Sequence, residues 1–177
     1  MGLQIESGVG NSNQAEVTDK NMLRTFAMTE THAAYESYSA GDAYTWSASY
    51  NGGAADTILW LRNDDTTKDL IIDKVIIANS STLTQFSLHS PANATPAGTT
   101  VVGVNLNRKV GKIALATAVQ DETNNTQANV IASGMIKGAT IMMPVDGVIV
   151  LGYHDCLAVD FVTASTIASV TFRGFYH

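Results

Sequence analysis

Helical periodicity is scarce along this chain, and short runs of β-branched and aromatic residues take its place. Residues 43–50 alternate Tyr44, Trp46 and Tyr50 with small polar neighbours, which is the period-2 pattern of a strand. Clusters of Gly, Asn, Asp, Ser and Pro separate the runs, as they do between strands. Roughly ten short strands with turns between them predict a β-sandwich or barrel rather than alternating strands and helices.

A nearly continuous apolar run at residues 57–63 is followed by a polar turn at 64–69 and a second apolar run at 70–79. This pattern predicts an antiparallel hairpin with a longer loop. Further strands are expected at 84–90, 101–107, 112–119 and in five runs between 130 and 177, with breaks at 144–147 and 153–155. Uneven spacing and two long polar loops favour a jelly roll over a simple meander. We therefore predict an all-β, jelly-roll-like antiparallel β-sandwich.

The N-terminal part of the chain differs from the rest. Residues 1–22 lack strand periodicity, so we expect an extended N-terminal arm there and a single sandwich domain over 23–177. A helical turn or two is expected within residues 28–41, because helix-tolerant residues follow a threonine cap and Gly41 stands at the end. A chain of 177 residues is long enough to bury a sizeable core without disulfides.

Charge and hydropathy narrow the possible partners. The net charge is −6 at pH 7, which disfavours nucleic acid, and the only basic cluster is Arg108, Lys109 and Lys112. No apolar run approaches the ~18 residues that span a bilayer, and the start lacks a secretion signal. We expect a soluble protein that is made in a cytoplasm and binds neither nucleic acid nor membrane.

The candidate catalytic motifs in the sequence are incomplete or have a simpler explanation. Gly8 and Gly10 begin a dinucleotide-binding pattern, but Asn13 stands where its third glycine belongs, and no strand–helix context surrounds it. His154 and Cys156 could meet as base and nucleophile if they share a strand face, although a turn followed by a packed cysteine explains them better. No Gly-x-Ser-x-Gly or P-loop motif occurs.

The residues that could form a metal or sugar site also have simple structural explanations. The acidic residues at 64, 65, 69 and 73 lack EF-hand spacing and match ordinary turn chemistry. His32, His89 and His177 are scattered, although distant strands could still bring them together as in a cupin. The aromatic residues of the first two strands either stack on a glycan or, more simply, fill the core. We predict no cofactor, no metal and no enzymatic activity.

A family resemblance covers most of the chain. "GVGNSNQAEVTDKNMLRTFA" resembles the Gly- and Asn-rich opening of a group of tailed-bacteriophage virion proteins, whose arm leads into a Val-x-x-x-Asn-x-Leu element, here Val17, Asn21 and Leu23. "GDAYTWSAS", "ILWLRNDDTTKDLIIDKVII" and the closing runs from "GVIVLGYHDC" to "ASVTFRGFYH" are similar to strands of jelly-roll capsid-associated proteins. "YHDC" departs from the glycine-rich turn that is usual there.

The resemblance implies a decoration (cement) protein on the capsid exterior of the virion, and an alternative role in the tail, neck or fibre, binding virion proteins or host glycans. It implies the major capsid protein and further copies of the chain as partners, with a homotrimer favoured. The arm would supply the capsid or subunit contact. The residues expected there are Gly8, Gly10, Asn11, Asn13, Val17, Asn21 and Leu23.

Overall fold

Thirteen strands are found in the computed structural model, which describes residues 16–17, 23–24, 35, 37, 40–52, 56–80, 83–92, 96–122, 127–163 and 165–177. They are β1 (Glu16–Val17), β2 (Leu23–Arg24), β3 (Ala43–Gly52), β4 (Asp56–Asn63), β5 (Leu70–Asn79), β6 (Thr84–His89), β7 (Thr99–Thr100), β8 (Val104–Asn105), β9 (Ala116–Gln120), β10 (Val130–Ile136), β11 (Ala139–Leu151), β12 (Cys156–Phe161) and β13 (Ser165–Tyr176).

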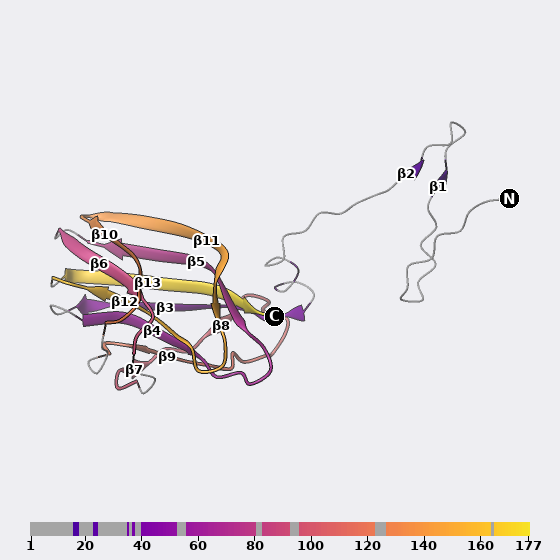
Figure 1. Cartoon of the computed structure of the whole chain (residues 1–177), viewed down its shortest axis with the longest axis horizontal. Helices are drawn as coiled ribbons and strands as arrows, with labels where there is room; N and C mark the ends of the chain where they lie inside the picture. The colour runs from indigo at the N-terminus through magenta and orange to yellow at the C-terminus, as the bar shows by residue number, and fades with distance from the viewer. Residues whose placement is uncertain are drawn as a thin grey trace. The chain divides into compact units, whose positions relative to one another are not determined.

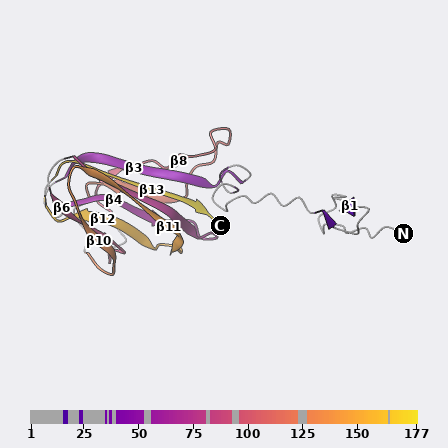
Figure 2. The ribbon, with the colours of Figure 1, turned by 90° about the horizontal axis from the view of Figure 1, so that it is seen from above.

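Two antiparallel sheets form a sandwich (Figures 1 and 2). The six-stranded sheet has the order β10-β6-β12-β4-β9-β7 and the five-stranded sheet the order β11-β5-β13-β3-β8. The pairing is nested, since β3 pairs with β13, β4 with β12, β5 with β11 and β6 with β10. A single long ribbon of paired strands thus wraps around the core, which is the jelly-roll arrangement. The predicted fold class is confirmed.

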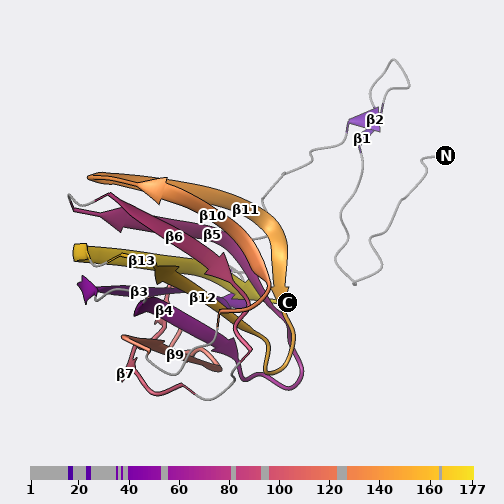
Figure 3. The ribbon, with the colours of Figure 1, turned by 60° about the vertical axis from the view of Figure 1, so that its left-hand side comes forward.

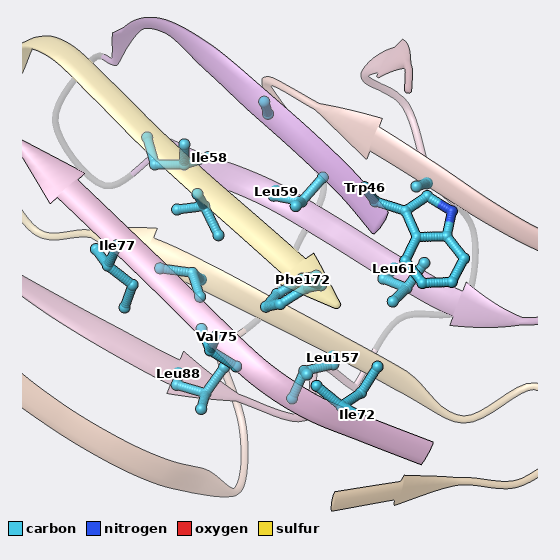
Figure 4. Close-up of a cluster of buried hydrophobic side chains, with 14 of the residues drawn as sticks. Trp46, Ile58, Leu59, Leu61, Ile72, Val75, Ile77, Leu88, Leu157 and Phe172 are labelled. Atoms are coloured by element: carbon cyan, nitrogen blue, oxygen red, sulfur yellow. The ribbon is translucent and has the colours of Figure 1, made fainter. Parts of the chain in front are cut away.

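The core lies between the sheets and is filled from both (Figure 4). Trp46, Val75 and Phe172 come from the five-stranded sheet and are fully buried. Leu59 and Leu157 meet them from the six-stranded sheet. Buried and partly buried residues alternate along β5, as successive side chains of a strand point to opposite faces, except at one bulge.

That bulge carries a paired charge. Lys74 pairs with Arg173 and Ile72 with Gly174, so Asp73 is the extra residue and points outward beside Arg173. The guanidinium of Arg173 donates to both carboxylate oxygens of Asp73, and these bonds raise the pKa of Arg173. A Cβ on Gly174 would lie 2.5 Å from the Ile71 carbonyl oxygen, which explains the glycine there.

The structure corrects the predicted hairpin over residues 57–79. β4 and β5 lie in different sheets, and residues 64–69 cross from one sheet to the other (Figure 3). Asn63 directs this crossing because its buried side chain donates to the carbonyls of Lys68 and Leu151 and accepts from the amide of Asp65. Pairing with β12 and β9 on one side, and with β11 and β13 on the other, replaces the local pairing.

Two other expectations change in detail. The break predicted at 144–147 is a register shift within the single long strand β11. The runs at 101–107 and 112–119 form strand only at β8 and β9. We call residues 101–115, which include the two residues of β8, the 101–115 loop. Within the predicted helical segment, Tyr35, Ser37 and Ala40 are helical, and Gly41 follows with φ of 68°. That left-handed conformation is typical of the residue after a helix.

Contacts divide the chain into residues 1–31 and 32–177, whereas the predicted boundary follows residue 22. Only β1 and β2 are described in the first unit. They pair antiparallel, with Val17 opposite Leu23 and Glu16 opposite Arg24. The sequence interpretation treated Val17 and Leu23 as successive positions of an arm that leads into the core, and their pairing with each other was not foreseen.

Candidate functional site

A buried polar cluster lies on the outer face of the six-stranded sheet. His89 is completely buried, and its Nε2 lies 2.8 Å from Oδ2 of Asp160. The hydroxyl of Thr57 donates to the other carboxylate oxygen at 2.7 Å. Because these residues come from β6, β12 and β4, the cluster ties three neighbouring strands together. Sequence spacing gave no signal for it, since its members come from three distant parts of the chain.

The segments that follow β6 and β9 are hydrogen-bonded over the outer face of the six-stranded sheet. The Glu122 carboxylate accepts from the amide of Ala97, and the Gln127 side chain donates to Ser87, which lies opposite Asp160 in the register. A histidine, a carboxylate and a hydroxyl therefore lie close together, but His89, Thr57 and Ser87 are at most 2% exposed. A catalytic group must reach its substrate, so this geometry fits fastening of the covering segments rather than hydrolysis.

The turn before β12 separates the expected base from the expected nucleophile. His154 has φ of 68°, and its ring stacks on Tyr153 with centroids 3.8 Å apart. The Cys156 thiol instead donates to the His154 carbonyl at 3.4 Å. Burial raises the pKa of this thiol to about 11, so the reactive thiolate is disfavoured at neutral pH. The arrangement does not activate Cys156.

The acidic residues after β4 are used within the fold. Asp64 accepts from Arg62 at 2.6 Å and from Thr117. Asp65 accepts from the amide and hydroxyl of Thr67, and the bond from the Thr67 amide, followed by further bonds, holds the pKa of Asp65 below its usual value. Asp69 pairs through its backbone with His177. These are turn and ion-pair functions, as the spacing indicated.

Within the described ranges, no group of three His, Cys, Asp or Glu side chains is placed to hold a metal ion. None of the helical segments described is long and apolar enough to cross a bilayer. His32 lies outside the described residues, and His177 is exposed at the chain end.

The aromatic residues considered for glycan stacking are buried. Trp46, Trp60 and Tyr44 are each at most 1% exposed. Tyr44 packs between Trp46 and Tyr176, with ring centroids 6.0 and 5.7 Å apart. Arg62 covers the outer face of Trp60 at 5.7 Å. Tyr44 and Trp46 lie in the core, whereas Trp60 is buried in a smaller cluster with Val119, Cys156 and Ala158, so none of the three rings presents a face to a sugar.

Of the residues assigned to the arm, only two are described, and they face each other across the β1–β2 pair as Val17 and Leu23. The remaining positions, Gly8, Gly10, Asn11, Asn13 and Asn21, lie outside the described residues.

Sequence reasoning missed the surface on which exposed apolar side chains gather. We call the first group the loop stripe. It consists of Val102, Val104, Leu106, Ile113 and Leu115, all on the 101–115 loop beside β3 and β9. We call the second group the edge-strand side. It consists of Val130, Ile131 and Met135 on β10, with Met142 and Val150 on β11. Alternation of valine and leucine at 102, 104 and 106 is the available signal, but it predicts only a strand over 101–107 and does not show that these side chains are exposed.

Comparisons with known proteins add no relative: no protein-family description, curated protein or solved structure matches the chain. The functional interpretation therefore depends on the geometry above and on the resemblance described from the sequence.

Proposed function

We propose that this chain is a structural protein of tailed-bacteriophage virions, which binds the outer surface of the capsid as a decoration (cement) protein and stabilises the head. The observation that carries the proposal is the concentration of exposed apolar side chains on two lateral sides of a jelly roll. Large exposed apolar groups of this kind mark surfaces for protein partners. The buried side chains of Thr57, Asn63 and His89, in contrast, bond to other groups of the fold.

A virion brace requires rigidity and many repeated contacts. The nested strand pairing links the first and last strands of the sandwich, since β13 pairs with β3 along its length. Weak contacts repeated over a shell add up through avidity. We propose the major capsid protein and other copies of the chain, as a homotrimer, for its partners. The protein would be made in the host cytoplasm and reside on the capsid exterior.

We assign the capsid or subunit contact of the arm to the seven positions between Gly8 and Leu23 named above. A segment that orders on docking can wrap a neighbour and enlarge the interface at an entropic cost. The alternative role as a glycan-binding fibre module loses its simplest platform, because Trp46 and Trp60 are buried.

The test uses particles of the phage that encodes this chain. Antibodies against the recombinant protein should label the capsid exterior in many copies, and heads that lack the protein should release DNA at a lower temperature. A chain without residues 1–21 should bind such heads more weakly while its sandwich remains folded. Labelling confined to the tail, or no labelling at all, would refute the decoration role. Equal binding by the truncated chain would refute the arm alone.

A further inference from the structure

Two lateral sides of the sandwich hold ten of the fifteen large apolar side chains that are exposed in the described part of the chain, so the pattern is not random scatter. β10 and β11 are the outer strands at one side, and β7 and β8 at the other, so the two apolar sides are opposite (Figure 1). The outer face of the five-stranded sheet is polar along its central strands, where Ser47 bonds to Thr171 at 2.8 Å and Arg173 to Asp73.

The loop stripe is held firmly in place. The amide of Leu106 donates a hydrogen bond to the Ala43 carbonyl at 2.9 Å, and the amide of Asp64 donates one to the Leu115 carbonyl at 2.9 Å. Lys112 bonds to the Ala40 carbonyl and to Asp42 at 2.7 and 2.8 Å. With these contacts satisfied, Ile113 remains 79% exposed and Val102 73% exposed, which are the largest exposures among these apolar residues.

The edge-strand side contains a matching depression. A hollow of about 360 Å³ lies between β10, β11 and β12 and is lined by Ile131, Ile149, Val150, Leu157, Cys156 and Asp155. Among the strands that the structure describes, β10 and β11 each form the outer edge of a sheet, and β10 has no charged residue along it. Uncharged exposed edges normally require a cover, because they invite pairing with other chains.

The two surfaces lie at the same end of the sandwich. Asp42 joins Lys112 of the loop to Lys68 of the 64–69 crossing, with both distances below 3 Å. Asn63, at the start of that crossing, exchanges backbone bonds with His154 and Asp155 of the turn beside the hollow. Copies placed side by side in the same orientation would therefore bring the loop of one to the height of the hollow of the next.

The charges at the two surfaces are opposite. Arg108 and Lys109 are exposed at the tip of the loop, and no ion pair involves either side chain in the part of the chain that the structure describes. Asp155 is exposed at the rim of the hollow. With a net charge of −6, two copies repel each other on average, so a basic corner against an acidic rim favours one relative placement.

We propose that a second copy of this chain occupies each surface, in a head-to-tail contact. The loop stripe of one copy packs on the edge-strand side of the next, with Ile113 in the hollow and Arg108 and Lys109 facing Asp155. A contact between unlike surfaces closes into a ring or continues as a chain. This inference rests on the self-association in the proposed function and names the surfaces that produce it.

Sedimentation velocity of the full-length protein over a range of concentrations tests the contact. Ile113→Glu should raise the dissociation constant of the oligomer at least about tenfold, as expected for an interface anchor. The matched control is Val162→Glu, because Val162 is 46% exposed but belongs to neither surface. Melting curves establish that each variant is folded.

Charge reversal tests the pairing itself. Arg108→Glu with Lys109→Glu, and separately Asp155→Lys, should each weaken association, and the three changes in one chain should restore it. If Asp155→Lys has no effect while the loop changes do, the head-to-tail pairing is wrong. If the wild type oligomerises and Ile113→Glu does not matter, these surfaces are wrong but self-association stands. A wild type that stays monomeric overturns self-association, whereas capsid binding is judged separately by the labelling test.

Discussion

At Gly103 the backbone of the 101–115 loop passes directly over Trp46. A Cβ placed there would lie 2.4 Å from Nε1 of the indole and 3.0 Å from Cβ of Ala114, so both sides of the space are already occupied. The loop therefore covers one lateral side of the core only because residue 103 has no side chain. This close approach also sets how the loop stripe is presented.

Gly103→Ala should lower the free energy of unfolding by about 1–3 kcal/mol, because overpacking forces the loop or the indole to move. Gly111→Ala is the matched control in the same loop, since a Cβ there meets nothing within 4 Å. Urea unfolding followed by tryptophan fluorescence measures both. Equal effects of the two changes would mean that the contact at Trp46 does not constrain the loop.

Asn63 acts at the same scale, at the end of β4 where the 64–69 crossing begins. Its side chain makes three bonds from a fully buried position, at 2.9, 2.9 and 3.0 Å. Asn63→Ala should cost about 2–4 kcal/mol, because buried carbonyl and amide groups lose their partners. Thr66→Ala, an exposed change in the same crossing, should stay within about 0.5 kcal/mol. A small effect of Asn63→Ala in denaturant unfolding would contradict its role in the crossing.

Among the elements, the loop and the 64–69 crossing are joined through one carboxylate. Burial alone would raise the pKa of Asp42, but hydrogen bonds from Lys112 and Lys68 outweigh it and leave the pKa below the ordinary 3.8. A lowered folded-state pKa means that the ionised group stabilises the fold above about pH 4. This contribution is lost as the pH falls below 3.8 and through the lower folded-state value.

Asp42→Asn should therefore destabilise the protein at pH 7 by about 1 kcal/mol, a modest value because both lysines are half exposed and screened by water. The difference from the wild type should shrink below pH 4. Thermal melts of both proteins between pH 2.5 and 7 provide the measurement. A difference that stays constant over this range would show that the charge of Asp42 is not what stabilises this end of the sandwich.

On the outer face of the six-stranded sheet, Asp160 accepts from both His89 and Thr57. Asp160→Ala leaves two buried polar groups without their acceptor and should cost about 3–5 kcal/mol. Asp69→Ala is the control, since Asp69 is exposed and pairs through its backbone. Chemical denaturation measures the free energy of unfolding of both variants. If Asp160→Ala lowers it no more than the control does, the cluster does not hold the covering segments on the sheet.

The elements also mark where prediction from sequence succeeds and fails. Period-2 alternation identified β3 and β6, because inward and outward positions differ in polarity, whereas β5 was expected from its apolar run. It could not say that β4 leaves β5 for another sheet, since strand partners are chosen by contacts between distant residues. It predicted a strand over 101–107 but could not say that Val102, Val104 and Leu106 are exposed, because a buried and an exposed apolar stripe have the same period. His89 and Asp160 come together only through the β6–β12 register.

For the whole molecule, the nested pairing makes the last strand central. β13 lies between β5 and β3, and it places Val170 and Phe172 in the core with no exposure. Removing an inner strand exposes two sheet edges and opens the core, so the remaining strands have no stable substitute. Residues 1–31, in contrast, form a contact unit of their own, distinct from residues 32–177.

Two truncations should therefore differ sharply. A chain that begins at His32 should keep one cooperative melting transition close to that of the full chain, since a loss of 1 kcal/mol would shift it by only about 2–4 °C. A chain that ends at residue 164 removes fewer residues but should show no cooperative transition and should expose apolar surface to a hydrophobic dye. Calorimetry measures the melting transition of both proteins, and dye binding measures their exposed apolar surface. A folded chain without β13 would contradict the nested topology, and an unfolded chain without residues 1–31 would contradict the independence of the sandwich.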